Sequence, residues 1–377
     1  MTHYDITIIG AGPAGATLAR TLQDNYKVLL VDKRPLDTVP SKRIKNCGGL
    51  IAPDAQKALA GFGLSIPKSV LVSPQMFSVH TIDFDNGLSR DYQRHYINVD
   101  RERYDRWLVS LVDERVEQMF GTRFRQAALL DTEGYKVTLL QEGKALEITT
   151  DILIGADGAN SKVKKMLSTQ THTPKRYISI QEWFPNTTGL NQYVAMFDSQ
   201  ISDFYSWIIP KDGEIIFGSA IEEGKDIHRL HALQKQKLSA YGYDLSAPRK
   251  REGCHLLRPM GSRDIALGEG RVALIGEAAG FISPTSAEGI SYAMLSGEAL
   301  GRAIAEDKEN YMDLYAKYVK PLKNNIAQKM LKYPAMYHRY LRKAIFKSGI
   351  GAMSCQRRRS ACSIPTKNVG CPMQLLG

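Results

Sequence analysis

The sequence predicts an α/β protein in which a parallel β-sheet is followed by an inserted antiparallel sheet and a helical C-terminal segment. Three observations support this prediction. The first 33 residues read as strand, glycine-rich turn, helix and strand, the order of a parallel α/β unit. Residues 176–254 form short β-like runs separated by Asn, Asp, Gly and Pro, without a helical period. The residues after Asp313 combine basic charge with apolar side chains at helical spacing.

The strongest local signal lies within the first 33 residues. A β-branched run at 6–9 indicates a buried parallel strand, and G-x-G-x-x-G follows at 10–15. A helix with a small-residue face is expected at 14–22 and a second apolar strand at 27–31, with Asp32 at its end. This combination is the fingerprint of an adenine-dinucleotide site, whereas the glycines alone would also fit an ordinary strand-to-helix turn.

Each residue of this turn has a physical role in the fingerprint. Gly10 makes the tight turn, Gly12 lets the backbone approach a pyrophosphate, and Gly15 lets helix and strand pack closely. Pro13 suits the first helical turn, where its missing N–H is not needed. The N-terminus of the helix faces the phosphates, and Asp32 is placed to bind the hydroxyl pair of a ribose.

Length and composition limit the class of protein. A chain of 377 residues suits one large domain or two fused domains, and its 43% of hydrophobic residues can bury a core. No run of about 18 apolar residues predicts a transmembrane helix, and the N-terminus enters the first strand without a signal peptide. The five cysteines form no C-x-x-C pair, which favours a reducing cytoplasm.

The net charge of +11 is concentrated at one end of the chain. After Asp313 there are 13 Lys and Arg residues and no acid, whereas the rest of the chain has 37 basic and 39 acidic residues. A nearly neutral body argues against an enzyme that binds nucleic acid in a basic cleft. The basic appendage is suited to an anionic lipid surface or an acidic partner, or is simply solvated.

Two segments after the fingerprint carry candidate ligand contacts. Cys47-Gly48-Gly49 follows a loop with two prolines, and its glycines give a backbone that can closely approach a flat ligand. Cys47 is either a small buried hydrophobe or a thiol beside a redox ring. Asp100 is expected to cap a helix that begins at Arg101, which either reaches a cofactor phosphate or ring or is solvated.

Two later strands also end in glycine-rich turns. A buried strand leads into G-A-D-G-A-N-S at 155–161, where Asp157 either faces a ligand or closes a generic Asx turn. A strand at 271–275 leads into G-E-A-A-G-F at 276–281, and a helix is expected to begin near Ser286. The N-terminus of that helix would offer free N–H groups and a partial positive charge.

Residues 176–254 are expected to form the antiparallel sheet. The β-like runs lie at 178–184, 193–197, 205–209 and 215–220. Inserted into an α/β chain, such a sheet is the natural wall of a substrate pocket. Its aromatic residues Trp183, Phe184, Tyr205 and Trp207 either face that pocket or belong to the core of the sheet.

Together these motifs resemble a known class of flavoproteins. The segments 10–15, 155–161 and 276–281 fall in the order and spacing of flavoprotein hydroxylases and reductases of the p-hydroxybenzoate hydroxylase fold. The element Arg101-x-x-Tyr104-Asp105 matches as well. The resemblance covers residues 1 to about 305 and leaves the C-terminal segment largely unmatched.

Two motifs are similar to the geranylgeranyl reductase family within this class. They are Cys47-Gly48-Gly49 and Y-S-W-I-I-P-K-D-G at 205–213. Glu277 departs from the pattern because the class usually has Asp there, although the carboxylate is kept. Ile209 replaces the usual Phe, which makes Y-x-W-x-I-P similar to the W-x-W-x-I-P of flavin-dependent halogenases.

The resemblance implies a Rossmann-like FAD-binding domain of the glutathione reductase and p-hydroxybenzoate hydroxylase type. That domain would comprise 1–75, 96–170 and 255–305, with an antiparallel-sheet substrate domain at 76–95 and 171–254 and a basic helical segment at 306–377. The candidate cofactor-binding residues are Gly10, Gly12, Pro13, Ala14, Gly15, Asp32, Lys33, Cys47, Gly48, Arg101, Asp157, Gly158, Gly276, Glu277, Gly280, Gly289 and Ile290. The candidate catalytic residues are Cys47, Tyr205 and Trp207, and no metal site is expected.

The activity that the resemblance implies is reduction of carbon–carbon double bonds in an isoprenoid or prenyl lipid. Reduced flavin would give hydride to one alkene carbon, and Cys47 or Tyr205 would protonate the other. NAD(P)H or a reduced electron carrier would bind only transiently, because no second dinucleotide fingerprint is present. The alternatives are a monooxygenase or halogenase acting on an aromatic substrate, and a prenyl-binding carrier without catalytic activity.

The C-terminal segment has the pattern of an amphipathic helix. Its apolar stripe comprises Tyr315, Tyr318, Leu322, Ile326, Met330, Tyr333, Tyr337 and Leu341. Kinks are expected at Pro321 and Pro334. The stripe either packs on the body with its lysines solvated, or the cations meet an anionic membrane, and both arrangements can coexist. The protein is predicted to lie in the cytoplasm, and the basic helix adds the prediction of peripheral contact with the inner face of the membrane.

Overall fold

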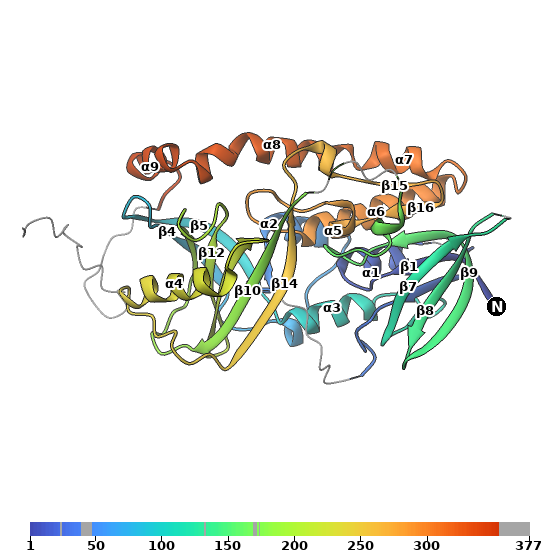
Figure 1. Cartoon of the computed structure of the whole chain (residues 1–377), viewed down its shortest axis with the longest axis horizontal. Coiled ribbons are helices and arrows are strands. Elements are labelled where there is room, and N and C mark those ends of the chain that lie inside the picture. Colours follow the sequence, from blue (N-terminus) through green and yellow to red (C-terminus); the bar gives the residue numbers. More distant parts are fainter. Residues whose placement is uncertain (23–24, 39–46, 132, 169–171, 173, 354–377) are drawn as a thin grey trace, which may run out of the picture.

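The computed structural model describes residues 1–22, 25–38, 47–131, 133–168, 172 and 174–353. Two eight-stranded sheets lie next to each other along the long axis, and the C-terminal helices run along both of them (Figure 1). The predicted α/β class with an inserted, mainly antiparallel sheet is confirmed. The last 24 residues of the predicted basic segment lie outside the described residues.

The first sheet contains the dinucleotide fingerprint. Its path runs β15-β16-β9-β1-β2-β6, and every neighbouring pair from β16 to β6 is parallel. An antiparallel extension of β7 and β8 is attached to β9. The strands are β1 (Thr2–Ile9), β2 (Val28–Val31), β6 (Glu117–Met119), β7 (Thr122–Leu129), β8 (Tyr135–Gln141), β9 (Lys144–Gly155), β15 (Gly268–Glu269) and β16 (Val272–Leu274).

Helices with small residues cover this sheet at close range. The helices associated with it are α1 (Pro13–Thr21), α2 (Pro53–Gly61), α3 (Arg101–Ser110), α5 (Gly276–Ala279) and α6 (Ile290–Glu306). On α6, a Cβ at Gly297 would lie 2.5 Å from the Ala14 carbonyl oxygen, and one at Gly301 would lie 2.2 Å from Thr21 Oγ1. These two glycines therefore allow α6 to pack directly against α1. Asp100 caps α3 as predicted, because its carboxylate accepts two backbone N–H groups of the first helical turn.

The second sheet has the order β14-β10-β13-β12-β11-β4-β5-β3. Its strands are β3 (Leu50–Ile51), β4 (Met76–Asp83), β5 (Leu88–Asn98), β10 (Lys175–Pro185), β11 (Tyr193–Phe197), β12 (Ser206–Lys211), β13 (Glu214–Glu222) and β14 (Lys250–Arg258). All pairs are antiparallel except β11 with β4. The strands at the two ends of this order are thus β3, which follows shortly after Cys47, and β14, which ends at Arg258. Short 3₁₀ turns occur at Lys68–Val70, Lys164–Met166 and Ser262–Asp264.

The expectation that 176–254 lacks a helix is wrong. Helix α4 (Ile227–Ser239) begins after Asp226, whose carboxylate accepts the Arg229 N–H, and it packs on the second sheet. Its inner face mixes the apolar Leu230 and Leu238 with the buried polar residues His231 and Gln234. Because half of the buried positions are polar, the apolar period that normally identifies a helix is weak.

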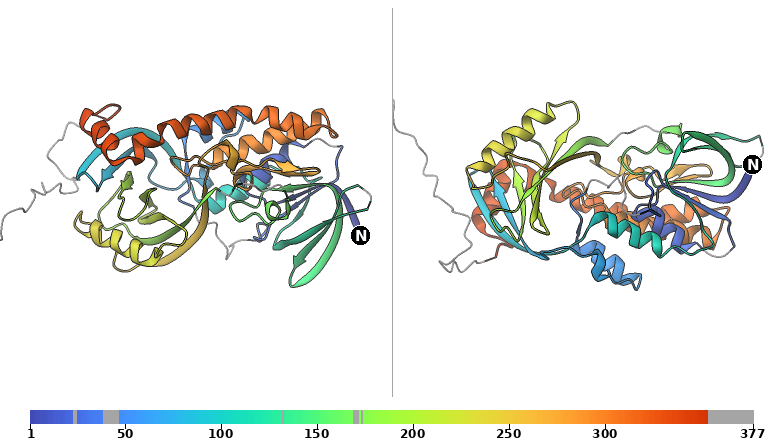
Figure 2. Two further views of the ribbon diagram at one scale, coloured as in Figure 1. Left: turned by 45° about the horizontal axis from the view of Figure 1, so that its top comes forward. Right: turned by 90° about the horizontal axis from the view of Figure 1, so that it is seen from below.

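The C-terminal segment forms three helices in place of one kinked helix. They are α7 (Tyr311–Tyr318), α8 (Lys320–Tyr337) and α9 (Arg339–Ser348). Pro321 lies in the first turn of α8, which tolerates it, and Pro334 lies inside α8, so the second break falls at His338. Both views in Figure 2 show these helices passing from the first sheet to the second. No helix in the described part of the chain is long and apolar enough to cross a membrane.

Candidate functional site: three converging turns and an aromatic cavity

The three glycine-rich turns meet at one edge of the first sheet. Parallel strands β1, β9 and β16 are neighbours, and Gly155 at the end of β9 is in register with both Ile9 and Leu274. The turns that follow them therefore emerge side by side at the carboxyl ends of the strands. This edge is where open parallel sheets bind nucleotide ligands.

The glycines of the first turn differ in what surrounds them. Gly10 has φ +112, and a Cβ there would lie 2.4 Å from the Ala156 carbonyl oxygen, so the first turn touches the second. A Cβ on Gly15 would lie 1.8 Å from the Gly10 oxygen. A Cβ on Gly12 would have nothing within 4 Å. Gly10 and Gly15 are thus required by the protein itself, whereas Gly12 leaves open space where a phosphate group would lie.

The carboxylate of Asp32 is buried and fully hydrogen-bonded within the protein. It accepts the Ala11 N–H at 2.8 Å, the Arg34 N–H at 2.8 Å and two bonds from the Arg34 guanidinium. The Arg34 guanidinium also donates to the carboxylate of Asp105, which accepts a second hydrogen bond from Arg101 Nε at 2.8 Å. A ribose at this position would therefore share Asp32 with Arg34. Sequence reasoning missed Arg34 and selected its neighbour Lys33, which is exposed to solvent.

Asp157 has the orphaned acceptor expected of a ligand contact. Its Oδ2 accepts the Lys162 N–H at 2.7 Å, but its Oδ1 is buried without a partner among the described residues. Burial raises the pKa of this carboxyl group, against hydrogen bonds from Ser161 and Lys162 that lower it. Gly158 has φ +78, and a Cβ there would have nothing within 4 Å, so this side of the turn is open. An unsatisfied oxygen beside the first turn fits a hydroxyl group of a bound cofactor.

The third turn is shaped by close packing. Gly276 has φ +58, and a Cβ there would lie 3.0 Å from the Ala14 side chain. Gly280 has φ +93, and a Cβ there would lie 2.6 Å from the Asp264 carbonyl oxygen. The Glu277 carboxylate accepts the Leu257 N–H at 3.0 Å and so links this turn to β14. Gly289 and Ile290 begin α6 and line the cavity described below.

The helix expected near Ser286 begins four residues later, at Ile290, because Ala287 has φ +52 and the preceding loop is held by side chains. Three successive carbonyl groups of that loop each accept one hydrogen bond. Arg258 Nε donates to Pro284, Tyr337 Oη to Thr285, and Tyr205 Oη to Ser286, at 2.9, 2.7 and 2.7 Å. The donors lie on β14, on α8 and one residue before β12, so three elements far apart in the chain hold this loop in place.

A cavity of about 600 Å³ lies between the second sheet, this loop and helices α8 and α9. Alternate residues of the strands face it, as the pleat of a sheet requires. They include Tyr193, Ala195 and Phe197 on β11, Tyr205, Trp207 and Ile209 along β12, and Tyr92, Arg94 and Tyr96 on β5. Trp207 and Tyr205 therefore line the cavity, whereas Phe184 lies in a separate core cluster and Trp183 packs under Lys250.

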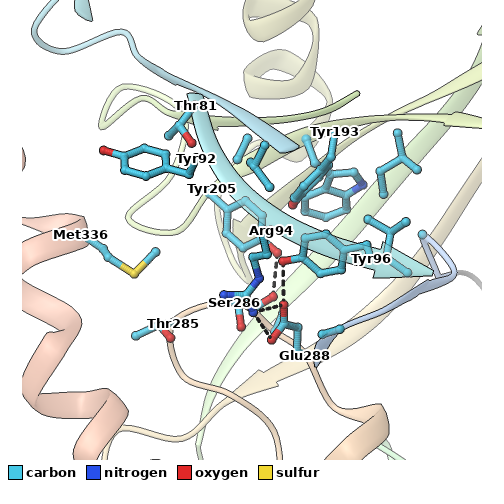
Figure 3. Close-up of a pocket in the computed structure, with 18 of the residues that line it drawn as sticks. Thr81, Tyr92, Arg94, Tyr96, Tyr193, Tyr205, Thr285, Ser286, Glu288 and Met336 are labelled. Carbon is cyan, nitrogen blue, oxygen red and sulfur yellow. Dashed lines mark hydrogen bonds and ion pairs between the residues drawn. The ribbon is translucent and has the colours of Figure 1, made fainter. Parts of the chain in front are cut away.

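Arg94 and Glu288, two of the charged residues that line this cavity, lie together in one corner, whereas Arg342 lines it from α9. Figure 3 shows Arg94 and Tyr96 of β5 converging on Glu288, which precedes α6. Arg94 Nη2 lies 3.0 and 3.1 Å from the two carboxylate oxygens, and the Tyr96 hydroxyl donates at 2.8 Å. Burial and the nearby Glu288 raise the pKa of Tyr96 well above its ordinary value, so it remains a hydrogen-bond donor. Sequence reasoning missed this corner, since its residues are nearly 200 positions apart.

Cys47 lies at the wall of the cavity, next to two cations. Burial opposes the charge on Arg101, but Asp105 and a hydrogen bond with Cys47 outweigh it and raise the pKa of Arg101. Burial lowers the pKa of Lys211 to about 8, although Cys47 acts in the opposite direction. The Lys211 ammonium donates to Asn98 Oδ1 at 2.6 Å. The thiol thus lies beside two cationic groups, which would stabilise the negative charge left when it gives up a proton.

The two glycines after Cys47 are explained by protein packing. A Cβ on Gly48 would lie 2.4 Å from Ile209 Cδ1, and one on Gly49 would lie 2.3 Å from the Val99 carbonyl oxygen. The pair therefore lets this segment lie against β12 and the end of β5. Approach to a flat ligand is not needed to explain them, although the segment does line the cavity.

The predicted catalytic residues come together in this cavity, since Cys47, Tyr205 and Trp207 all line it. Burial and neighbouring tyrosines raise the pKa of Tyr205 well above its ordinary value. Its hydroxyl proton is already engaged with the Ser286 carbonyl group. Cys47 is therefore the better placed of the two candidate proton donors.

These features define the class of protein. No protein-family model matches the chain. It is similar to a geranylgeranyl bacteriochlorophyll reductase-like protein from Thermoplasma acidophilum, with a TM-score of 0.75, 15% identity, and coverage of 92% of this chain and 99% of the other. The flavin-dependent halogenase CmlS gives a TM-score of 0.70 at 18% identity, over 96% and 75% of the two chains. PqsL of Pseudomonas aeruginosa, a probable FAD-dependent monooxygenase, gives a TM-score of 0.66 at 16% identity, over 92% of this chain and 100% of the other. The chain thus has the fold of FAD-dependent oxidoreductases.

Similarity of sequence identifies the family within that class. The chain is 39% identical over 350 residues to protein CbrA of Escherichia coli O6:H1, which covers 93% of this chain and 94% of that protein. It is 38% identical to protein CbrA of Shigella sonnei, over 93% and 98% of the two chains. The chain belongs to the CbrA family.

Proposed function

We propose that this protein binds FAD and reduces carbon–carbon double bonds of an isoprenoid or another prenyl compound. The observation that supports the proposal most strongly is the aromatic-lined cavity, one wall of which is the loop between the third glycine-rich turn and α6. A cavity of about 600 Å³ holds a ligand of lipid or drug size. The structural similarity to the geranylgeranyl bacteriochlorophyll reductase-like protein of Thermoplasma acidophilum agrees with this chemical class of substrate.

FAD fits the residues at the sheet edge. The open backbone at Gly12 would lie against the pyrophosphate, and Asp32 with Arg34 would hold the adenosine ribose. The unpartnered Oδ1 of Asp157 would accept a hydroxyl group from the middle of the cofactor. The N-terminus of α6 would favour negative charge on the ring system. When bound, reduced FAD would supply the hydride for one carbon of a double bond.

The chain itself must supply the proton for the other carbon and exclude water. Cys47 lines the cavity and has a proton to give, and Arg101 and Lys211 stabilise the thiolate that remains. The aromatic side chains keep the cavity dry, which an isolated alkene needs because it is a poor hydride acceptor. Solvent returns the proton to the thiolate after product release. NAD(P)H or a reduced electron carrier would deliver electrons in a transient complex.

The proposal is tested by anaerobic incubation of the dithionite-reduced, FAD-loaded protein with a panel of prenyl lipids. Mass spectrometry should detect products that have gained two hydrogens per reduced bond, with matching reoxidation of the flavin. The result that would refute the proposal is slow reoxidation unaffected by every prenyl compound. Purified protein without flavin that cannot be reconstituted would instead support a non-catalytic carrier.

A second candidate is oxygen-dependent chemistry on an aromatic substrate. It is favoured by the similarity to CmlS and PqsL and by Y-x-W-x-I-P at 205–210. Substrate-dependent consumption of oxygen together with NAD(P)H, and an added oxygen or halogen atom in the product, would select this function. Reduction of prenyl lipids in the absence of oxygen would exclude it as the explanation of turnover.

We further propose that α9 and the residues after it contact anionic membranes. Apolar side chains are exposed here, with exposed fractions of 67% for Tyr340, 48% for Leu341 and 73% for Ile350. Lys343 and Lys347 lie among them, and each cation near an anionic surface contributes about 1 kcal/mol. Most of the apolar stripe that precedes α9 packs against the core instead of being exposed. This is one of the two arrangements predicted from the sequence.

The position of α9 links such a surface to the cavity. Its residues Ile345 and Phe346 form part of the cavity wall. Flotation with anionic vesicles should recover the protein at low salt and lose it at high salt. Serine at both Tyr340 and Leu341 should weaken flotation without changing the melting temperature. Equal recovery with neutral vesicles would contradict an electrostatic contact.

A further inference from the structure

One patch of the cavity wall carries polar atoms without partners. Gly218 on β13 is directly opposite Gln181 on β10 and also opposite Trp207 on β12. Directly opposed residues of antiparallel strands point to the same face of a sheet, and both Gln181 and Trp207 line the cavity. These two side chains therefore flank a position that has no side chain.

Gly218 makes room for the indole ring. A Cβ at this position would lie 2.4 Å from Trp207 Cε2, 2.5 Å from Nε1 and 2.6 Å from Cζ2. The indole ring thus lies directly on the backbone of β13, which holds its N–H group on the strand next to Gln181. Any other residue at 218 would displace the ring.

Both polar groups are buried, with exposed fractions of 3% for Gln181 and 7% for Trp207. Within the described residues, Gln181 Oε1 and Trp207 Nε1 nevertheless have no hydrogen-bond partner. Two other polar groups of the cavity are satisfied, since Tyr96 donates to Glu288 and Tyr205 donates to a backbone carbonyl group. Buried donors and acceptors are normally paired, so one of each on the same cavity face indicates the position of a ligand group.

We propose that Gln181 and Trp207 form a subsite for a hydroxyl group on an otherwise apolar ligand. The indole N–H donates to the hydroxyl oxygen, and the hydroxyl proton is donated to Gln181 Oε1. An ionised carboxylate or a phosphate dianion has no proton for that oxygen, and a hydrocarbon satisfies neither atom. The subsite refines the proposed function, on which it rests for the isoprenoid nature of the ligand: the substrate is an isoprenoid alcohol.

Binding to the oxidised, FAD-loaded protein tests the subsite without turnover. The probes are dodecanol, its methyl ether and dodecane, with farnesol and its methyl ether as a prenyl set. The alcohol can use both protein atoms, the ether only the indole N–H, and the hydrocarbon neither. Comparing each variant with the wild type for the same probe cancels the differences in probe hydration.

Trp207→Phe keeps an aromatic ring and removes the donor, so it should weaken alcohol and ether about tenfold and leave the hydrocarbon unchanged. Gln181→Met keeps the size of the side chain and should weaken the alcohol alone, again about tenfold. Arg94→Gln, in the charged corner, is the control and should leave the alcohol-to-ether ratio unchanged. Flavin content and melting temperature verify that each variant is folded.

The outcomes separate the subsite from the function. The subsite would be overturned if Arg94→Gln lowered the ratio of alcohol affinity to ether affinity and Gln181→Met did not. It would also be overturned if none of the five probes bound. The expected pattern with dodecyl probes alone would support the subsite and count against an isoprenoid substrate. Equal weakening of all probes by both variants would show that these residues only shape the cavity and would also overturn the subsite.

Discussion

Replacing single glycines of the first turn should separate folding from cofactor binding. A Cβ on Gly15 would lie 1.8 Å from the Gly10 oxygen, so Gly15→Ala must move helix against strand by more than an ångström. Such overpacking should lower the free energy of unfolding by about 3 kcal/mol. Gly12 has φ −77 and ψ −173, which alanine adopts, and its Cβ would touch nothing within 4 Å. Gly12→Ala should therefore change the stability of the apoprotein by less than about 1 kcal/mol.

The same methyl group on residue 12 would occupy the space proposed for the pyrophosphate. FAD affinity of Gly12→Ala should fall at least about hundredfold, equivalent to about 2.7 kcal/mol. The assay combines urea denaturation of the apoprotein with titration of FAD followed by flavin fluorescence. Wild-type FAD affinity in Gly12→Ala would refute the assignment of this turn to the pyrophosphate. A stable Gly15→Ala apoprotein would refute the packing argument.

Three further outcomes are expected. Cys47→Ser should retain FAD but lower turnover, since a hydroxyl group is a much weaker acid, and unchanged turnover would exclude Cys47 as the proton donor. Tyr337→Phe should free the Thr285 carbonyl group and lower the free energy of unfolding by about 1 kcal/mol, which urea denaturation measures. Burial opposes the charge of Glu182, but His231, Lys235 and Arg251 outweigh it and lower its pKa from 4.5 to about 2. Its ion pairs thus stabilise the protein above pH 4.5 and are lost as the pH falls toward 2, so Glu182→Gln should cost about 2 kcal/mol at neutral pH and flatten this pH dependence.

The features that the sequence predicted well are those set by neighbours in the chain. Gly10 and Gly15 are required by contacts within one strand-turn-helix unit, and Asp100 caps the helix that it precedes. Such constraints leave a local pattern that can be recognised without knowing the rest of the fold. Ile9, Gly155 and Leu274 end neighbouring parallel strands, so the three turns recognised in the sequence meet at one edge of the sheet.

The features that sequence reasoning missed depend on residues far apart in the chain. Arg94 and Glu288 form an ion pair only because β5 of the second sheet passes the N-terminus of α6. Gln181 and Trp207 become neighbours through the register of β10, β13 and β12. No local pattern announces such pairs. Gly48 remains a prediction, since its close contact with the end of the Ile209 side chain offers a second explanation for the glycine beside the approach of a ligand.

The C-terminal helices form part of the wall of the proposed substrate cavity, and two buried arginines show why they cannot be a detachable appendage. Arg342 of α9 is 3% exposed and donates to Asp83 and Asp85 at the end of β4. Arg258 of β14 lies beneath the rings of Tyr333 and Tyr337 of α8, 4.6 and 4.5 Å from their centroids. Removing α8 and α9 would take away the guanidinium group that pairs with the carboxylates of Asp83 and Asp85, and would uncover the buried Arg258, which is strongly destabilising. The same helices carry the cations proposed to meet the membrane. Tyr337 of α8 also donates to the Thr285 carbonyl group, so these helices are in direct contact with the loop that precedes α6. Truncation is therefore the wrong test of membrane contact, and exposed-face substitutions on α9 are the right one.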